Sequence, residues 1–136
     1  MTEHDESLRL PEGKEPTLRV IPMPADANHT GDIFGGWIMS QVDIAASVVA
    51  FRRARGRVVT VAVNSFEFHQ PVFVGDLISC YAEVTRIGRT SLSVRVEVYA
   101  ERNRQKEECI KVTEATLTFV AVDEQRKPRV VPREEE

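Results

Sequence analysis

The chain of 136 residues contains little cysteine, and its two cysteines, Cys80 and Cys109, lie far apart in the sequence. It has no Cys-x-x-Cys pair, so the spacing expected of a structural zinc site or a dithiol redox motif is absent. So few cysteines also argue against a disulfide framework. We therefore expect two unpaired thiols on strands, in a protein of a reducing compartment.

Long hydrophobic runs are missing as well. The most apolar stretch, residues 37–51, is interrupted by Ser40, Gln41, Asp43 and Ser47, which is unlike a membrane span. The sequence does not begin with basic residues followed by an apolar segment, so a signal peptide is not predicted. These features predict a cytoplasmic protein without membrane insertion.

The chain also lacks a strong excess of charge. Its net charge of −3 argues against nucleic acid as a partner, and its 42% hydrophobic content is typical of a globular domain. The acidic excess lies at the two ends of the chain, which leaves the middle open to an anionic ligand. We predict a flexible acidic tail at residues 1–15, one domain at residues 16–123, and a C-terminal tail at residues 124–136.

Hydrophobic periodicity predicts one long helix and five strands. We expect strands at residues 18–23, 57–68, 77–87, 91–102 and 109–122, with a loop at residues 25–36 and the helix at residues 36–54. The helix is apolar on most of its circumference, so it should be buried. A lone apolar helix among strands with short turns indicates an α+β fold, in which an antiparallel sheet curls around the helix.

The segment from Asn28 to Asp43 is the most informative part of the sequence. It contains a polar loop, the pair Gly35-Gly36, and then a single carboxylate within an apolar run. A carboxylate in apolar surroundings is costly unless it is partnered, which favours a chemical use for Asp43. The glycine pair lies where a helix would begin, and the free amides of a helix start can bind an anion.

This segment resembles the hotdog-fold acyl-CoA thioesterases, and within them the YciA-like branch. The resemblance rests on Asn28, Gly35-Gly36 and Asp43, and on the segments 24–28, 31–41, 58–64 and 71–76. It implies a hotdog fold and the hydrolysis of acyl-coenzyme A thioesters without a metal or other cofactor. It also implies assembly into homodimers, and in this branch into hexamers made of three dimers. Many related enzymes have a histidine just before the glycine pair, where this chain has Phe34.

The resemblance also implies the site residues. Asn28, Gly35 and Asp43 should lie together with Thr60 beside them as the catalytic group. Gly36 and the turn residues Arg89, Thr90 and Ser91 should contact the substrate, because coenzyme A carries phosphates that favour cations and hydroxyls. Asp43 could activate water as a general base or attack the thioester itself, and an amide of Gly35 could bind the developing oxyanion.

Each of these residues also has a structural interpretation. Asp43 could bond a neighbouring amide, Asn28 could be a turn residue, and Thr60 could be an ordinary strand residue. The arginines at residues 52–57 suit a solvated helix C-terminus. His29 and His69 have no partner that suggests a metal site, so we predict none.

Two other functions fit the same fold. A dehydratase or hydratase acting on acyl thioesters would need a carboxylate and a histidine together, and no histidine lies suitably in the loop-helix segment. A non-catalytic acyl-CoA-binding module would be expected to lack the carboxylate that Asp43 supplies.

Overall fold

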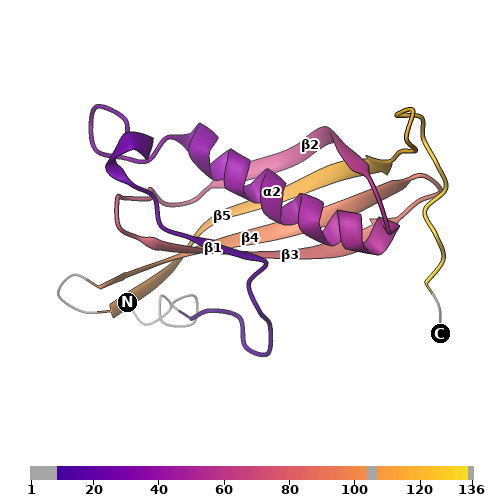
Figure 1. Cartoon of the computed structure of the whole chain (residues 1–136). Helices are drawn as coiled ribbons and strands as arrows, with labels where there is room; N and C mark the ends of the chain where they lie inside the picture. Colours follow the sequence, from indigo (N-terminus) through magenta and orange to yellow (C-terminus); the bar gives the residue numbers. More distant parts are fainter. Residues whose placement is uncertain (1–8, 104–106, 135–136) are drawn as a thin grey trace.

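The computed structural model describes residues 9–103 and 107–134, and Figure 1 shows their arrangement. The elements are β1 (Leu18–Val20), the 3-10 helix η1 (Pro24–Asp26), α2 (Gly35–Ala54), β2 (Val58–Phe68), β3 (Leu77–Ile87), β4 (Ser91–Asn103) and β5 (Glu107–Ala121). The predicted helix and the five predicted strands are all present, and only the short helix η1 was not foreseen. Residues 1–8 of the predicted N-terminal tail, and residues 104–106 of the turn between the last two strands, lie outside the described residues.

The strands form one antiparallel sheet in the order β1-β3-β4-β5-β2. Helix α2 lies across one face of this sheet (Figure 1), and β2, which follows it in the chain, forms an edge. The core lies between the helix and this face, where alternate residues of β4 and β5 point inward. The predicted hotdog arrangement is therefore confirmed.

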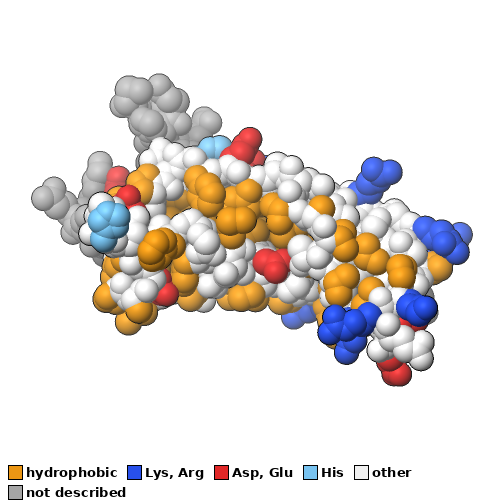
Figure 2. Space-filling view, turned by 90° about the horizontal axis from the view of Figure 1, so that it is seen from above, with side chains coloured by type: hydrophobic (Ala, Val, Ile, Leu, Met, Phe, Trp, Pro, Cys, Tyr) orange, Lys and Arg blue, Asp and Glu red, His pale blue; other side chains and the backbone are white. Residues whose placement is uncertain are grey.

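Only one face of α2 is buried in the single chain, although its composition predicted burial on most sides. Its exposed face carries Met39, Ile44 and Phe51, which are 42%, 49% and 55% exposed. Hydrophobic side chains gather along this side of the molecule in Figure 2, with lysine and arginine side chains at one end. The buried face consists of small and branched residues: Ile38, Val42, Ala45, Ala46, Ala50 and Ala54. Among the described residues, no helix has the length and apolar character needed to cross a bilayer.

The edge strand β2 is irregular at two points. Its register with β5 shifts between Thr60 and Ala62, and again between Val63 and Ser65. Bulges of this kind bend an edge strand and redirect its side chains. The first shift follows Thr60, whose side chain points toward α2.

Residues 124–134 of the predicted C-terminal tail pack against the end of α2. The Arg129 guanidinium donates hydrogen bonds to the carbonyl oxygens of Ala54, Val122 and Arg57. Ala54 is the last residue of the helix, so this cation satisfies a terminal carbonyl where the helix dipole favours positive charge. Val131 is 5% exposed and belongs to the core.

The two cysteines are unpaired and lie on strands, as predicted, and both are buried. Cys80 lies on β3 and Cys109 on β5. Burial raises the pKa of the Cys80 thiol to about 12 and that of Cys109 to about 11. Both thiols therefore stay protonated at neutral pH.

The outer face of the sheet, opposite α2, carries a network of ion pairs. Lys111 Nζ lies 3.0 Å from Glu97 and 2.8 Å from Glu114, and the Arg95 guanidinium contacts the same two carboxylates at 2.9 and 3.1 Å. The hydrogen bond from Lys111 lowers the pKa of Glu114. Burial alone would raise the pKa of Glu97, but Lys111 and Arg95 together lower it.

These lowered pKa values predict how stability depends on pH. Both carboxylates favour the folded state while they are charged, so their contribution is complete above the ordinary pKa near 4.5. It is lost as the pH falls through their folded-state pKa values. Glu114→Gln should therefore unfold more easily than wild type at pH 7 and approach wild-type stability as the pH falls well below 4.5. Urea unfolding across this range measures the difference, and parallel pH profiles would contradict it.

Candidate functional site

Asp43 and Thr60 form a hydrogen-bonded pair between helix and edge strand. The Thr60 hydroxyl donates to Asp43 Oδ1 at 2.8 Å, and this is the single hydrogen bond of the Asp43 carboxylate among the described residues. The carboxylate is half-buried in this chain, less enclosed than its apolar neighbours in sequence suggested. With Oδ1 held by Thr60, Oδ2 remains to take a proton from water or to attack a carbonyl carbon.

The start of α2 offers uncapped amide donors. The helix begins at Gly35, and the preceding residue, Phe34, makes no side-chain cap. The amides of Gly35 and Gly36 meet no acceptor within the described part of the chain. Such amides, aligned with the positive end of the helix dipole, are suited to bind a developing oxyanion.

Asn28 organises the loop before this helix. Its side-chain oxygen accepts hydrogen bonds from the Thr30 amide and hydroxyl, at 2.9 and 2.8 Å, and from the Asp32 amide at 3.1 Å. Asn28 is thus a turn residue, one of the two interpretations that the sequence allowed. Because these donors fix the oxygen, the side-chain NH₂ is the group left to contact a substrate oxygen or a water.

A pocket lies beside the helix start and has a volume of about 370 Å³. This volume would suit a small acyl group. The pocket brings Asn28 and Gly35 together. Its remaining lining residues are Asp32, Ile33, Ile38, Phe68, His69, Gln70, Pro71 and Val72.

Within one chain, the expected catalytic residues form two separate groups. Asn28 and Gly35 line the pocket at the start of α2, whereas Asp43 and Thr60 meet farther along the helix. Gly35 and Asp43 are eight residues apart on one helix, which separates them by about 12 Å along its axis. The expectation that all four residues lie together is therefore not met by a single chain.

The turn that carries Arg89, Thr90 and Ser91 lies at the same end of the sheet as Thr60. Ser91 and Val59 both pair with Val120 of β5, so the turn is two strands from the residue next to Thr60. Arg89 is exposed, and its carbonyl accepts a hydrogen bond from the Val131 amide. The carbonyl of Thr90 accepts one from Ala121.

This arrangement joins three cationic segments that are separate in the sequence. They are the helix end with Arg52, Arg53 and Arg55, the turn with Arg89, and the C-terminal segment with Arg126, Lys127, Arg129 and Arg133. Figure 2 shows lysine and arginine side chains gathered at this end of the molecule. Sequence reasoning missed the contribution of the C-terminal segment because nothing in its composition indicates that it folds back.

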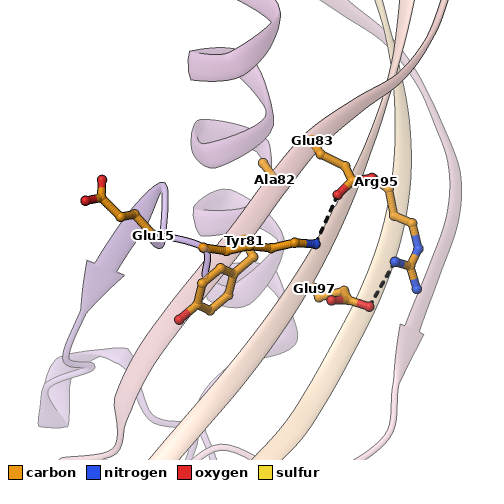
Figure 3. Close-up of a pocket in the computed structure, with 7 residues that line it drawn as sticks. Glu15, Tyr81, Ala82, Glu83, Arg95 and Glu97 are labelled. Atoms are coloured by element: carbon orange, nitrogen blue, oxygen red, sulfur yellow. Dashed lines mark hydrogen bonds and ion pairs between the residues drawn. The ribbon is translucent and has the colours of Figure 1, made fainter. Parts of the chain in front are cut away.

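A second cavity, of about 310 Å³, lies on the outer face of the sheet (Figure 3). Lys14 pairs there with Glu83, and Arg95 with Glu97, so its charged groups largely satisfy one another. It lies on the far side of the sheet from Asp43 and is not part of the candidate site.

Among the described residues, one group of side chains has ligand atoms close enough together to hold a metal ion, and it lies on the outer face. Atoms of Glu67, His69 and Glu114 lie within 4.8 Å of one another. However, Glu114 is already paired with Lys111 and Arg95, which would oppose a cation. We interpret this group as part of the ion-pair network.

The sequence analysis did not identify Phe68 as a residue that lies beside the helix start. Its ring packs against Gly35, where an added Cβ would lie 3.2 Å from Phe68 Cζ. The alternation of Phe66 and Phe68 indicated a strand, but only the fold places this strand end beside the helix start. Gly35 therefore has a packing reason to be glycine in addition to its amide.

The comparisons with known proteins agree with this geometry. Residues 30–107 match the thioesterase superfamily. The acyl-CoA thioester hydrolase YciA of Escherichia coli is 46% identical over 92% of this chain and 96% of its own length. A hexameric hotdog-fold thioesterase of Campylobacter jejuni is 43% identical, with a TM-score of 0.86 over 90% of this chain and 93% of its own. A hexameric thioesterase of Yersinia pestis is 45% identical, with a TM-score of 0.84 over 92% of this chain and 100% of its own. The chain belongs to the thioesterase superfamily, and within it to the YciA-like acyl-CoA thioester hydrolases.

Proposed function

We propose that this protein hydrolyses acyl-coenzyme A thioesters to a free acid and coenzyme A. The observation that carries the proposal is the hydrogen bond from Thr60 to Asp43, which orients a carboxylate on the face of α2. Neither a dehydratase nor a non-catalytic acyl-CoA-binding module is favoured, because the family is one of hydrolases and the carboxylate is present and oriented.

The chemistry needs a carboxylate and an oxyanion donor. Asp43 takes a proton from water as the water oxygen bonds to the thioester carbon, or its own oxygen attacks that carbon to give an anhydride that water then cleaves. In either case the carbonyl oxygen gains negative charge, which the Gly35 amide stabilises with support from Gly36 and the Asn28 side chain. In the general-base route the carbon–sulfur bond then breaks, and the leaving sulfur takes the proton that Asp43 removed from water. In the anhydride route the thiolate leaves as the anhydride forms, and water then cleaves the anhydride to give the free acid and the Asp43 carboxylate.

Asn28 and Gly35 lie apart from the Asp43–Thr60 pair within one chain. This separation is the reason to propose a site shared between subunits. Val61 and Val63, which are 53% and 47% exposed, lie on the free edge of β2 on either side of Ala62. Antiparallel pairing of this edge with a second copy would carry the Asp43–Thr60 pair toward the Phe68 end of the partner strand. That end lies against Gly35, so each site would combine Asp43 of one subunit with Gly35 and Asn28 of its partner. We propose a homodimer of this kind, assembled further into a hexamer like those of the solved relatives.

The cationic end of the molecule is proposed to receive the phosphates of coenzyme A. Arg89 projects there from its turn with Thr90 and Ser91, near the start of β2. Guanidinium and hydroxyl groups at a surface suit phosphate binding.

The proposed reaction uses no metal or other cofactor, because a carboxylate and amide donors suffice for a thioester with a good leaving group. We place it in the cytoplasm, as the sequence predicted, with no nucleic acid or membrane as a partner.

Asp43→Asn tests the catalytic role. The change keeps the shape of the side chain but removes its basicity, so acyl-CoA hydrolysis should fall about 10²–10⁴-fold while the fold is retained. Thiol release monitored with a chromogenic reagent gives the rate, and the melting temperature confirms folding. A folded variant that keeps more than about a tenth of the wild-type rate would overturn the assignment.

Val63→Lys tests the shared site. A charge on the free edge of β2 opposes pairing of that edge with another strand. The wild type should sediment as a hexamer, and the variant should sediment as smaller species with strongly reduced activity. Val74→Lys is the matched control, because Val74 is 39% exposed and lies outside the strands. A stable monomer with full activity would refute the shared site.

Arg89→Ala tests the nucleotide contact. Loss of a charge-assisted phosphate contact should raise KM for acyl-CoA about tenfold with little change in kcat. The variant should treat an acyl-pantetheine, which has the same thioester but no nucleotide, as wild type does. Equal losses on both substrates would show that Arg89 acts through the fold or the reacting centre instead.

A further inference from the structure

Residues 69–76, which join β2 to β3, form one wall of the pocket beside Gly35, and we call them the wall segment. Four of them line the pocket: His69, Gln70, Pro71 and Val72. The wall segment lies between the two strands and outside both of them. A connecting segment of this kind lacks the hydrogen-bond ladder of a sheet, so its position depends more on side-chain contacts.

Arg102 of β4 holds the wall segment through a buried ion pair. Its guanidinium donates to Asp76 Oδ1 at 3.2 Å and Oδ2 at 2.9 Å, and to the Pro71 carbonyl at 3.2 Å. The guanidinium also lies 4.9 Å from the centre of the Phe73 ring, and the Phe73 amide donates to Asp76 Oδ2 at 2.9 Å. One cation therefore contacts three residues of the wall segment.

The burial of this ion pair indicates a need for fixed geometry. The side chains of Arg102 and Asp76 are 11% and 2% exposed, and among the described residues every other ion pair is more exposed. Apolar residues of similar volume often stabilise a fold as well as a buried ion pair does. A pair with two parallel contacts, by contrast, fixes both the distance and the direction of its partner.

The wall segment in turn holds Asn28. The Ile33 amide donates to the Val72 carbonyl at 2.9 Å, and Asp32 forms a β-bridge with Phe73. Asp32 binds Asn28 twice, because its amide donates to the side-chain oxygen at 3.1 Å and its carbonyl accepts from the Asn28 amide at 2.7 Å. The place of the Asn28 side chain in the pocket therefore depends on the wall segment.

We propose that Arg102 and Asp76 are positioning residues for the reaction. Neither lines the pocket, so they act through the residues that they hold. They fix the wall segment, which keeps Asn28 where its NH₂ group contacts the thioester oxygen or the attacking water. This inference rests on the proposed acyl-CoA hydrolysis and on the role proposed there for Asn28.

Arg102→Lys tests the positioning role. Lysine keeps the charge but cannot reproduce the two parallel contacts with Asp76. The kcat for a short acyl-CoA should fall about tenfold, because small displacements of a substrate-contacting group slow the reaction. KM should change little, and an acyl-pantetheine should show the same loss, because the nucleotide contacts are untouched. A folded variant with the wild-type kcat would overturn the inference.

Arg95→Lys is the matched control. It makes the same change on the same strand, in an ion pair with Glu97 and Glu114 that does not include the wall segment. This control should keep the wild-type kcat on both substrates. An equal loss in the control would show that Arg102→Lys acts through general stability, which would also overturn the inference.

A paired variant guards against a loss caused by an unpaired buried charge. Arg102→Met together with Asp76→Asn removes both charges and keeps an oxygen that can accept from the Phe73 amide. The paired variant should fold and should lose at least as much kcat as Arg102→Lys. Wild-type kcat in this variant would show that the ion pair does not position the site.

Hydrogen exchange tests the contact without using activity. The Ile33 amide is bonded to the wall segment, so it should exchange about tenfold faster in Arg102→Lys than in wild type or Arg95→Lys. Exchange at the wild-type rate would show that Arg102 does not hold the loop that carries Asn28.

Asn28→Ala shows whether the ion pair acts through Asn28. In that background Arg102→Lys should lower kcat less than about twofold, because the side chain that it positions is absent. An undiminished loss would mean that another group is positioned, and wild-type kcat in Asn28→Ala alone would mean that Asn28 has no role to support. Either result would refute the inference while leaving acyl-CoA hydrolysis intact. If the wild type hydrolyses no acyl-CoA, the proposed function fails and the positioning role fails with it.

Discussion

Close packing of α2 on the sheet sets the position of the Asp43–Thr60 pair in the candidate site. Four of the six buried helix residues are alanine, so little side-chain volume separates the helix from the strands. The approach is near enough for Thr60 of β2 to reach Asp43 at 2.8 Å. Bulkier residues on that face would lift the helix and lengthen this contact. The small core residues therefore set the distance between the helix and the sheet, and this distance determines whether Thr60 can bond Asp43.

The same helix carries two chemical functions that its own geometry keeps apart. Its first turn presents amide donors, and its third turn presents a carboxylate, and a rigid helix cannot bring them together. The exposed apolar residues along its outer side and the free edge of β2 are both surfaces that a second copy would cover. The proposed site shared between two copies would account for three features together. These are the separation of the amide donors from the carboxylate, the exposure of Met39 and Phe51, and the free edge of β2.

The local patterns in the sequence predicted the elements well and their contacts less well. Alternation and turn residues located the five strands, and the glycine pair located the helix start, because these signals depend on residues near in sequence. The contact of Phe68 with Gly35 joins residues 33 positions apart. It depends on the register of β2 and could not be derived from either segment alone. The contacts of Arg129 at the end of α2 could not be predicted either. Its partners are backbone carbonyls, which every residue has, so the sequence gives no sign of which ones it meets.

The buried cysteines have a consequence for an enzyme whose product is a thiol. Each turnover releases coenzyme A, and its oxidised forms exchange with protein thiolates to give mixed disulfides. Exchange requires a deprotonated and accessible sulfur. Cys80 and Cys109 are both buried, with pKa values of about 12 and about 11, so neither presents a thiolate to solvent. The folded chain is therefore resistant to modification by the disulfides that its product forms on oxidation, and its activity should not depend on the redox state of the coenzyme A pool.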